Sequence, residues 1–433
     1  MLVVTNVQKI SNLNQSNPIV YLEVSDLLRR LNFGLPLDGI TRVTLLALQA
    51  LTAQYGEQRV RLLIFDAVFS TFREMPTAMI ARRFKTLGNT ESNTVLTSNT
   101  PKLPPLIWPI AKPRPNDVMF YTGNWWWRPK AFQVFEKLKN RSGAKVVVFL
   151  HDLIPIVRSE YVEQEHARRF SEMLMRVCAA SSLIITNSMN SRLDISAWMH
   201  TSNLSDIPIA VTPLPHEFFQ QPNYQANIWG RLSKRWMEKR HRQSDVEFKS
   251  RVRGEPFVLM VGTIELRKSV PDLLRAWKKL QFNEQKILPW LVLVGKWAQG
   301  ADEIKALIRE LDENEKKVIV LNHVTDEMLI ELYAGCLFSV YVSRYEGWGL
   351  PIGESLWFGK RVLASKTSAM PEAGEDLVLY VDPNDHQGMV EGLQKMINDP
   401  DLTELRAIDK DRLRTINQFG DSICRALDVC IAN

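Results

Sequence analysis

The chain has 433 residues, of which 45% are hydrophobic and 24% charged, with a formal net charge of +6. This length is enough for two domains of roughly 200 residues, each with its own core. Four cysteines without a C-x-x-C pair predict neither a disulfide framework nor a zinc site. No apolar run approaches the ~18 residues of a membrane span, and the N-terminus lacks a signal-peptide layout, so we expect a cytoplasmic protein.

The charge is unevenly distributed, because residues 1–253 carry the basic excess and the remainder is acidic. A basic surface can attract nucleic acid, anionic lipid or a phosphorylated substrate. No nucleic-acid-binding module is recognisable, so we expect no nucleic acid partner and favour a lipid or phosphorylated ligand.

The first half begins like a nucleotide-binding α/β unit. Residues 18–24 predict a strand, 34–39 a breaker-rich loop and 40–54 an amphipathic helix. Arg42 lies at the start of this helix, where it could reach a bound anion or simply face solvent. An irregular connection is predicted over 85–115. Further strands are predicted over residues 60–65, 117–121, 145–150, 181–186 and 207–211.

Two features follow predicted strands in this half. Trp125, Trp126 and Trp127 cannot all face one core, so either one is exposed as a platform for a sugar ring or a membrane, or all three wedge loops together. His151 follows an apolar strand directly, where it could bind a sugar hydroxyl or phosphate or serve a structural role.

Residues 223–255 interrupt the periodic pattern and concentrate basic residues beside Trp229 and Trp236. This stretch predicts either a membrane-surface helix on an anionic bilayer or a solvated linker. We therefore place a domain boundary here.

The second half restarts with a strand at 257–261, then Gly262, then Arg267 and Lys268 before a helix over 270–280. Free amides and two cations predict a phosphate site. The spacing is not that of a Walker A loop or of G-x-G-x-x-G, which counts against an ATPase or a dehydrogenase. Residues 291–294 with Lys296, and 318–321 with a helix capped by Thr325, repeat the strand-loop-helix pattern.

The segment 346–354 is the most informative. A buried strand over 337–342 is followed by glycines and Pro351, and a helix starts near Gly353. Glu346 and Glu354 therefore flank a turn at a strand end, where carboxylates can hold the hydroxyl groups of a polyol. Alternatively, they are a loop acid and a first-turn helix acid.

Five motifs in order resemble the family-4 retaining glycosyltransferases: V-G-T-I-E-L-R-K (261–268), L-V-L-V-G-K (291–296), H-V-T-D-E-M-L (323–329), E-G-W-G-L-P-I-G-E (346–354) and S-A-M-P-E-A-G (368–374). Weaker matches are G-I-T-R (39–42) and H-D-L-I-P (151–155). The resemblance implies a GT-B fold, an α/β architecture in which two Rossmann-like domains with parallel sheets face each other across a cleft. We expect an acceptor-side domain over 1–222, a basic linker over 223–255, a nucleotide-sugar domain over 256–400, and a helical segment over 401–433 that packs back on the first domain.

The resemblance also implies a role for each matching residue. Lys268 would contact the donor diphosphate, Glu354 the ribose, and Glu346 the donor sugar. The remaining expected contacts are backbone amides of Trp348, Gly349 and Leu350 to sugar or phosphate oxygens, Val324 beside the base, His151 near the transferred sugar, Gly39 and Arg42 near phosphates or acceptor, and the loop of Gly262 and Thr263. Many relatives have Arg at the position of Thr263, so Arg267 or Lys296 would supply the second cation.

The implied reaction retains the sugar configuration without a protein nucleophile, so Glu346 would position or stabilise charge rather than attack. The donor would be a nucleotide diphosphate sugar, with GDP-mannose the best match, and no metal is required. The acceptor would be a saccharide or lipid-linked saccharide in surface polysaccharide synthesis at the inner face of the plasma membrane. Asp399–Asp401 and Asp409–Asp411 imitate a D-x-D metal motif but are expected to be surface acids. A GT-B epimerase or phosphorylase, or a degenerate binding protein, remains an alternative.

Overall fold

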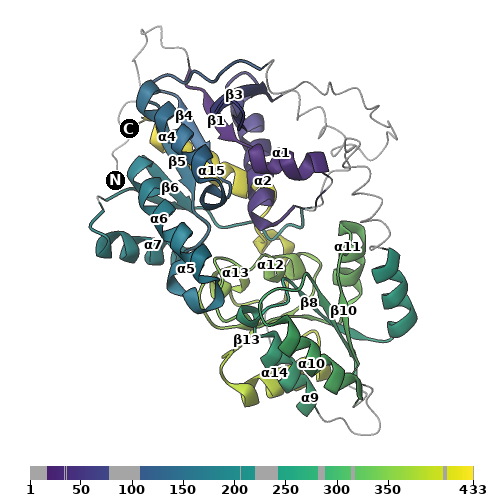
Figure 1. Ribbon diagram of the computed structural model, residues 1–433. Coiled ribbons are helices and arrows are strands. Elements are labelled where there is room, and N and C mark those ends of the chain that lie inside the picture. The colour runs from purple at the N-terminus through teal and green to yellow at the C-terminus, as the bar shows by residue number, and fades with distance from the viewer. Residues whose placement is uncertain are drawn as a thin grey trace, which may run out of the picture.

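The computed structural model describes residues 17–33, 35, 37–77, 108–204, 206–219, 242–280, 288–313, 317–402 and 407–432. Within these ranges the chain forms two α/β units, each built on its own sheet (Figure 1).

The first sheet has the order β3-β2-β1-β4-β5-β6-β7 in the described part of the chain. Its strands are β1 (Val20–Glu23), β2 (Val60–Asp66), β3 (Thr71–Pro76), β4 (Val118–Tyr121), β5 (Lys145–Phe149), β6 (Leu183–Thr186) and β7 (Ile209–Val211). All neighbours pair in parallel except β2 and β3, which form an antiparallel hairpin at the edge. The central strands are buried on both faces, which is why they consist of apolar runs rather than alternating patterns.

Helices cover both faces of this sheet. They are α1 (Ser25–Phe33), α2 (Gly39–Tyr55), α4 (Pro129–Ser142), α5 (Ile154–Val157), α6 (Gln164–Ala180) and α7 (Met189–Thr201). Side chains of α2 share one core with Val20 and Leu22 of β1, whereas α4 and α6 share the opposite core with Tyr21. The alternation of strand side chains between the two faces explains this division.

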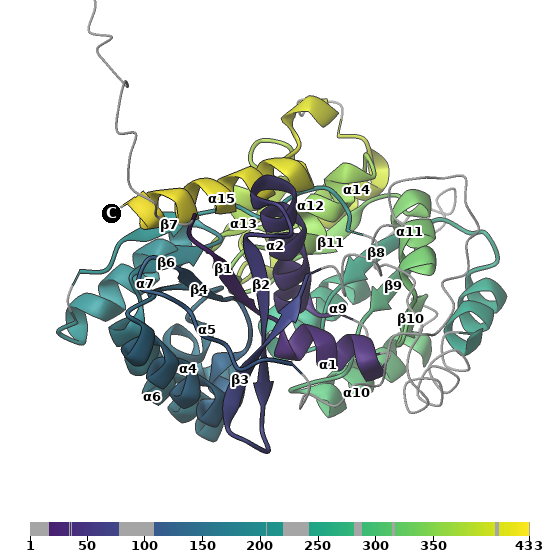
Figure 2. The same cartoon turned by 90° about the horizontal axis from the view of Figure 1, so that it is seen from above.

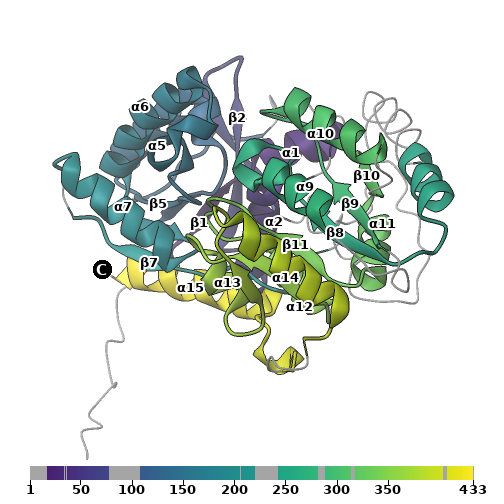
Figure 3. The same cartoon turned by 90° about the horizontal axis from the view of Figure 1, so that it is seen from below.

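The second sheet has the order β10-β9-β8-β11-β12-β13 in the part that the structure describes. Its strands are β8 (Phe257–Val261), β9 (Trp290–Val294), β10 (Val318–Leu321), β11 (Ser339–Tyr341), β12 (Val362–Ser365) and β13 (Leu379–Val381), all paired in parallel. Its helices are α9 (Val270–Lys279), α10 (Ala301–Glu313), α11 (Asp326–Gly335), α12 (Leu350–Trp357), α13 (Met370–Gly374) and α14 (His386–Asn398). Figure 3 shows α9, α10 and α14 side by side, and their apolar side chains form one core against the sheet.

If its strands are counted from β8, the second sheet has the doubly wound order 3-2-1-4-5-6, and the first sheet has the same order with β7 added at its edge. In this order the connections leave on opposite sides of two neighbouring central strands. Those pairs are β1 with β4 and β8 with β11. Ligands of open α/β sheets bind beside the carboxyl ends of such strands, so the fold itself predicts two ligand crevices.

The two units are joined by two chain crossings that are bonded to each other. The N–H of His216 donates to the carbonyl of Arg414 at 2.8 Å, and the N–H of Arg414 donates to Nδ1 of His216 at 2.8 Å. The Glu217 carboxylate accepts from the N–H of Ile416 at 2.8 Å. After the second crossing, α15 (Ile416–Ala432) lies along α2 in the first unit (Figure 2).

The predicted strands and the helices over 40–54 and 270–280 are confirmed, with ends shifted by a few residues. The predicted cap is confirmed too, since the Thr325 hydroxyl accepts from the N–H of Met328. The helical segment predicted over 401–433 was wrong at its start, because α15 begins at Ile416.

Two expectations fall largely outside the described residues. Of the basic stretch 223–255, the structure describes residues 242–255, of which 242–252 are helical. Of the predicted irregular connection 85–115, it describes residues 108–115, where Ile110 bridges to Arg73 of β3.

Candidate active site

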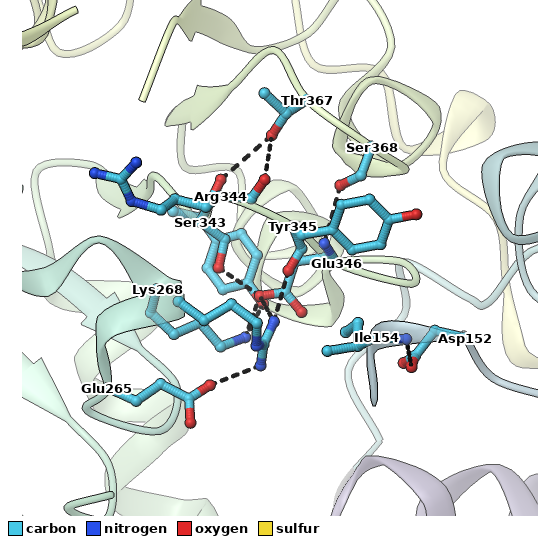
Figure 4. A network of polar contacts seen from close by, with 12 residues as sticks. Asp152, Ile154, Glu265, Lys268, Ser343, Arg344, Tyr345, Glu346, Thr367 and Ser368 are labelled. Carbon is cyan, nitrogen blue, oxygen red and sulfur yellow. Dashed lines mark hydrogen bonds and ion pairs between the residues drawn. The ribbon is translucent and has the colours of Figure 1, made fainter. Parts of the chain in front are cut away.

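The crevice at β8 and β11 brings together two segments that are far apart in sequence. A short helical turn, η5 (Leu266–Lys268), follows β8, and the loop that contains Glu346 follows β11. Lys268 and Glu346 are in contact and only 7% and 8% exposed. The cation and the acid singled out in the sequence therefore form one buried cluster (Figure 4).

Glu346 is surrounded by donors. Its carboxylate accepts from Lys268 and from the Ser343 hydroxyl, and lies 2.9 Å from Nη1 of Arg267. Burial alone would raise its pKa, but Arg267 and Lys268 outweigh burial and lower the pKa of Glu346 to about 2. Glu346 is thus a carboxylate at neutral pH, and Lys268, Arg267 and Ser343 all contact the same oxygen, Oε1.

Lys268 and Arg267 are held in place by further bonds. Nζ of Lys268 donates to the Tyr341 hydroxyl at 2.7 Å, and burial lowers the pKa of Lys268 while Glu346 opposes that shift. Arg267 donates to the Tyr345 carbonyl at 2.6 Å and to Glu265 at 2.7 Å. These bonds orient both cations before any ligand is bound, which lowers the reorganisation needed to bind an anion.

The loop that carries Glu346 is itself fixed. The N–H of Glu346 donates to the Ser368 hydroxyl at 2.9 Å, and the Thr367 hydroxyl lies 3.3 Å from the carbonyls of Ser343 and Arg344 (Figure 4). Thr367 and Ser368, in the segment before α13, therefore fix the backbone of the loop that carries Glu346.

Glu354 is the fifth residue of α12 and forms a second cluster with a residue from the other unit. Its carboxylate accepts from Nη1 of Arg42 at 2.9 Å and from the Tyr333 hydroxyl at 2.8 Å. Asp326 lies 3.8 Å from Nη2 of the same arginine. The structure therefore places Arg42, a candidate for anion contact, against two carboxylates across the interdomain boundary.

His151 and Asp152 face the Glu346 loop from the first unit. Nε2 of His151 is 3.1 Å from the Thr122 carbonyl, and burial lowers the pKa of His151 to about 4, so the imidazole is neutral at pH 7. A Cβ added to Gly347 would lie 2.6 Å from the His151 carbonyl and 2.9 Å from Cβ of Asp152. Only glycine permits this approach of the two units.

The remaining predicted residues lie around these clusters. Gly262 has φ +150°. A Cβ on Gly295 would lie 1.8 Å from the carbonyl oxygen of Gly262, so the loops that follow β8 and β9 pack with their backbones in direct contact. Gly349 has φ +113° and precedes α12. A Cβ on Gly39 would contact Leu350 at 3.7 Å, which places these two residues beside the Arg42 and Glu354 pair.

Other candidates are less closely connected. Trp348 is buried beneath Arg414, and Val324 is half-buried against the core of β9 and β10. Thr263 and Lys296 are exposed, so the structure favours Arg267 as the second cation next to Lys268. Our sequence reasoning missed Tyr333, Tyr341 and Ser343, although Tyr341 and Ser343 stand two apart at the end of the strand that leads to Glu346.

The described residues hold no group of three or more histidines, cysteines or acids placed to bind a metal ion. Within the same ranges, no helix is both long and apolar enough to cross a membrane.

The fold has known counterparts among solved structures. An α,α-trehalose-phosphate synthase (UDP-forming) from Burkholderia xenovorans, solved in complex with glucose-6-phosphate, superposes with a TM-score of 0.53 at 13% identity and covers 73% of this chain and 74% of that one. The protein thus has the GT-B fold. Residues 242–412 match the family described as "Glycosyl transferases group 1".

Two curated relatives are both from Escherichia coli. O-antigen chain mannosyltransferase B is 27% identical over 261 residues, which are 60% of this chain and 63% of that protein. Serotype-specific mannosyltransferase WbdA is 26% identical over 257 residues, 59% of this chain and 29% of that protein. The chain therefore spans less than two thirds of either relative's length.

Proposed function

We propose that this chain is a retaining glycosyltransferase that moves a mannosyl group from GDP-mannose to a saccharide or lipid-linked saccharide acceptor in surface polysaccharide synthesis. The observation that carries the proposal is the buried cluster of Lys268, Arg267 and Glu346 at the β8 and β11 crevice. The match of residues 242–412 to a glycosyltransferase family supports a nucleotide-sugar donor, and the names of the two curated relatives support mannose.

The cluster suits the departure of a nucleoside diphosphate. When the bond between the anomeric carbon and the phosphate oxygen breaks, negative charge grows on the diphosphate. Lys268 and Arg267, which follow β8, can stabilise this negative charge, and Glu346 neutralises part of their positive charge while no ligand is bound. The buried site strengthens each of these interactions relative to water.

Glu346 acts in this scheme by holding the two cations. A carboxylate with a pKa of about 2 that already accepts from Lys268 and Ser343 is a weak base and a poor nucleophile. The acceptor oxygen therefore attacks the anomeric carbon on the face that the diphosphate leaves, and its proton passes to a diphosphate oxygen. Neutral His151, on the facing unit, can bond a hydroxyl of the transferred sugar without adding charge.

Glu354 is proposed to hold the ribose hydroxyls of the donor. For that role the carboxylate must keep an oxygen lone pair for the ligand while Arg42 and Tyr333 orient it. Arg42 then links donor binding in one unit to the position of the other unit.

The test is a thermal-shift screen with GDP-mannose and with UDP, ADP and dTDP sugars on wild type, Glu354→Ala and a control, Glu303→Ala. Glu303 is an exposed acid on α10 that pairs with Arg275, far along the fold from the crevice. We expect GDP-mannose to raise the melting temperature of wild type and the control but not of Glu354→Ala. An equal rise in all three proteins would contradict the assigned site, and an inverted anomer in the product would contradict the mechanism.

A further inference from the structure

The second crevice of the fold, beside β1 and β4, is not used by the donor site described above. Two loops meet there, one leading from β1 into α1 and the other from β4 through η3 (Trp125–Trp127) into α4. Because ligands of doubly wound sheets bind at such positions, this crevice is the expected place for a second substrate.

The two loops are clamped together by Asp26. Its carboxylate accepts from Nδ2 of Asn124 at 3.0 Å and from Nη2 of Arg128 at 3.1 Å. Gly123 passes so close to Glu23 that an added Cβ would lie 3.5 Å from its carboxylate. The turn between Asn124 and Arg128 is therefore fixed at both ends.

The three adjacent tryptophans have three different environments. Trp125 is fully buried, with its ring 5.0 Å from that of Phe170. Trp126 is half-buried against Phe170 and His166. Trp127 is 55% exposed, and its ring lies 4.7 Å from the imidazole of His166. Trp127 therefore presents its indole to solvent from a rigid turn, where the flat apolar face of a ligand can stack on it.

The surroundings of Trp127 favour a neutral, polyhydroxylated ligand over an anionic membrane. Arg128 is paired with Asp26, and Arg168 and Arg169, on the same part of α6 as His166, are paired with Glu165. An anionic lipid surface attracts clusters of uncompensated cations. Aromatic rings beside planar, hydrogen-bonding side chains instead match the apolar face and the hydroxyl edge of a sugar.

Trp127 is within reach of an acceptor that extends from the proposed reaction site. It follows Thr122, whose carbonyl is 3.1 Å from Nε2 of His151, by five residues, so Trp127 and Thr122 lie at most about 17 Å apart. An acceptor of a few linked sugar rings bound beside His151 can therefore also contact Trp127.

We propose that Trp127, with His166, Asn124 and Arg128, forms an acceptor subsite that stacks a sugar ring remote from the one being glycosylated. The inference rests on the proposed glycosyl transfer, and it makes the acceptor an oligosaccharide chain rather than a single sugar or a sugar phosphate. The remaining clamp residue, Asp26, positions the subsite without touching the ligand.

The experiment is binding of the full chain to an array of defined neutral oligosaccharides, with Trp127→Ala, Trp127→Phe and the control Phe69→Ala. Phe69 is a comparably exposed aromatic, 56% accessible, at the tip of the β2 and β3 hairpin. We expect Trp127→Ala to weaken binding of oligosaccharides of three or more rings roughly tenfold, the size of one aromatic contact, and Trp127→Phe to retain part of it. Mono- and disaccharide binding, the melting temperature, and GDP release from GDP-mannose without acceptor should not change in either variant.

Three results would overturn the proposal. They are identical array profiles for wild type and Trp127→Ala, no oligosaccharide binding by wild type, or a loss in Trp127→Ala that affects only binding to phosphatidylglycerol vesicles. Failure of the donor proposal is distinguishable, because it would show as absent GDP-mannose binding whatever the array reports.

Discussion

Replacing Glu346 with glutamine tests the charge balance on which the proposed site depends. The substitution keeps the size of the side chain but removes the anion shared by Lys268 and Arg267. Both cations are then buried with less compensation, and breaking a buried ion pair from one side destabilises a protein by roughly 3 to 5 kcal/mol.

The pKa of Glu346 gives an independent magnitude. A shift from 4.5 to about 2 corresponds to about 3 kcal/mol of stabilisation of the charged form, at 1.36 kcal/mol per unit. Because the folded-state pKa is lowered, this stabilisation is present above pH 4.5 and is lost as the pH falls towards 2. The two arguments agree on a loss of about 3 kcal/mol for Glu346→Gln at pH 7.

Urea unfolding of wild type, Glu346→Gln and Glu346→Gln/Lys268→Met measures this loss. We expect the double variant to be more stable than the single variant, because removing Lys268 eliminates one uncompensated buried charge. A loss below about 1 kcal/mol in the single variant, or a double variant less stable than the single one, would refute the reasoning.

Three further predictions concern groups outside this cluster. Gly347→Ala should lower kcat/KM for transfer at least roughly tenfold with little change in melting temperature, because a Cβ there would lie 2.6 Å from the His151 carbonyl and hold the two units apart. Steady-state kinetics measure this effect. An unchanged kcat/KM would show that the contact is dispensable. Burial raises the pKa of Glu23 to about 7, so its ionisation should destabilise the fold increasingly as the pH rises from 4.5 to 7. In urea titrations, the unfolding free energy of Glu23→Gln should equal that of wild type at pH 4 and exceed it by up to about 3 kcal/mol at pH 8. Equal unfolding free energies at pH 8 would contradict this prediction. Burial lowers the pKa of His216 to about 4, so the stabilisation that its neutral imidazole contributes is present above pH 6.5 and is lost as the pH falls to 4. His216→Gln should therefore reduce the dependence of the unfolding free energy on pH between 6.5 and 4, whereas the exposed control His200→Gln should not.

The sequence was sufficient for the parts of the fold that depend on local pattern. Apolar runs such as 145–149 and 257–261 are strands because both faces of a parallel sheet are buried. The helix α1 and the hairpin strand β3 were not predicted. The segment Ser25–Phe33 is short and polar on average, and Thr71–Pro76 includes charged residues that pair at a sheet edge.

Contacts between the units could not be read from the sequence. Arg42 and Glu354 are separated by 312 positions, and only the closed arrangement of two sheets brings them within 2.9 Å. Likewise, the motif around Lys268 predicted a cation at a strand end but not that Glu346 would already be bonded to it. Which of three tryptophans is exposed depends on Phe170 and His166, which belong to a helix that begins about 40 residues later.

The paired crossings at His216 and Arg414 limit how the two units can move. A single linker allows one unit to bend and to rotate relative to the other. Two crossings that are hydrogen-bonded to each other instead restrict the motion to rotation about one hinge axis. We therefore expect the opening of the crevice to follow one direction, so that His151 and the Glu346 loop return to the same register after each substrate has entered and each product has left. The hinge between the two units then lies directly beside the crevice, because a Cβ on Gly353, the residue before Glu354, would lie 3.0 Å from Cα of His216.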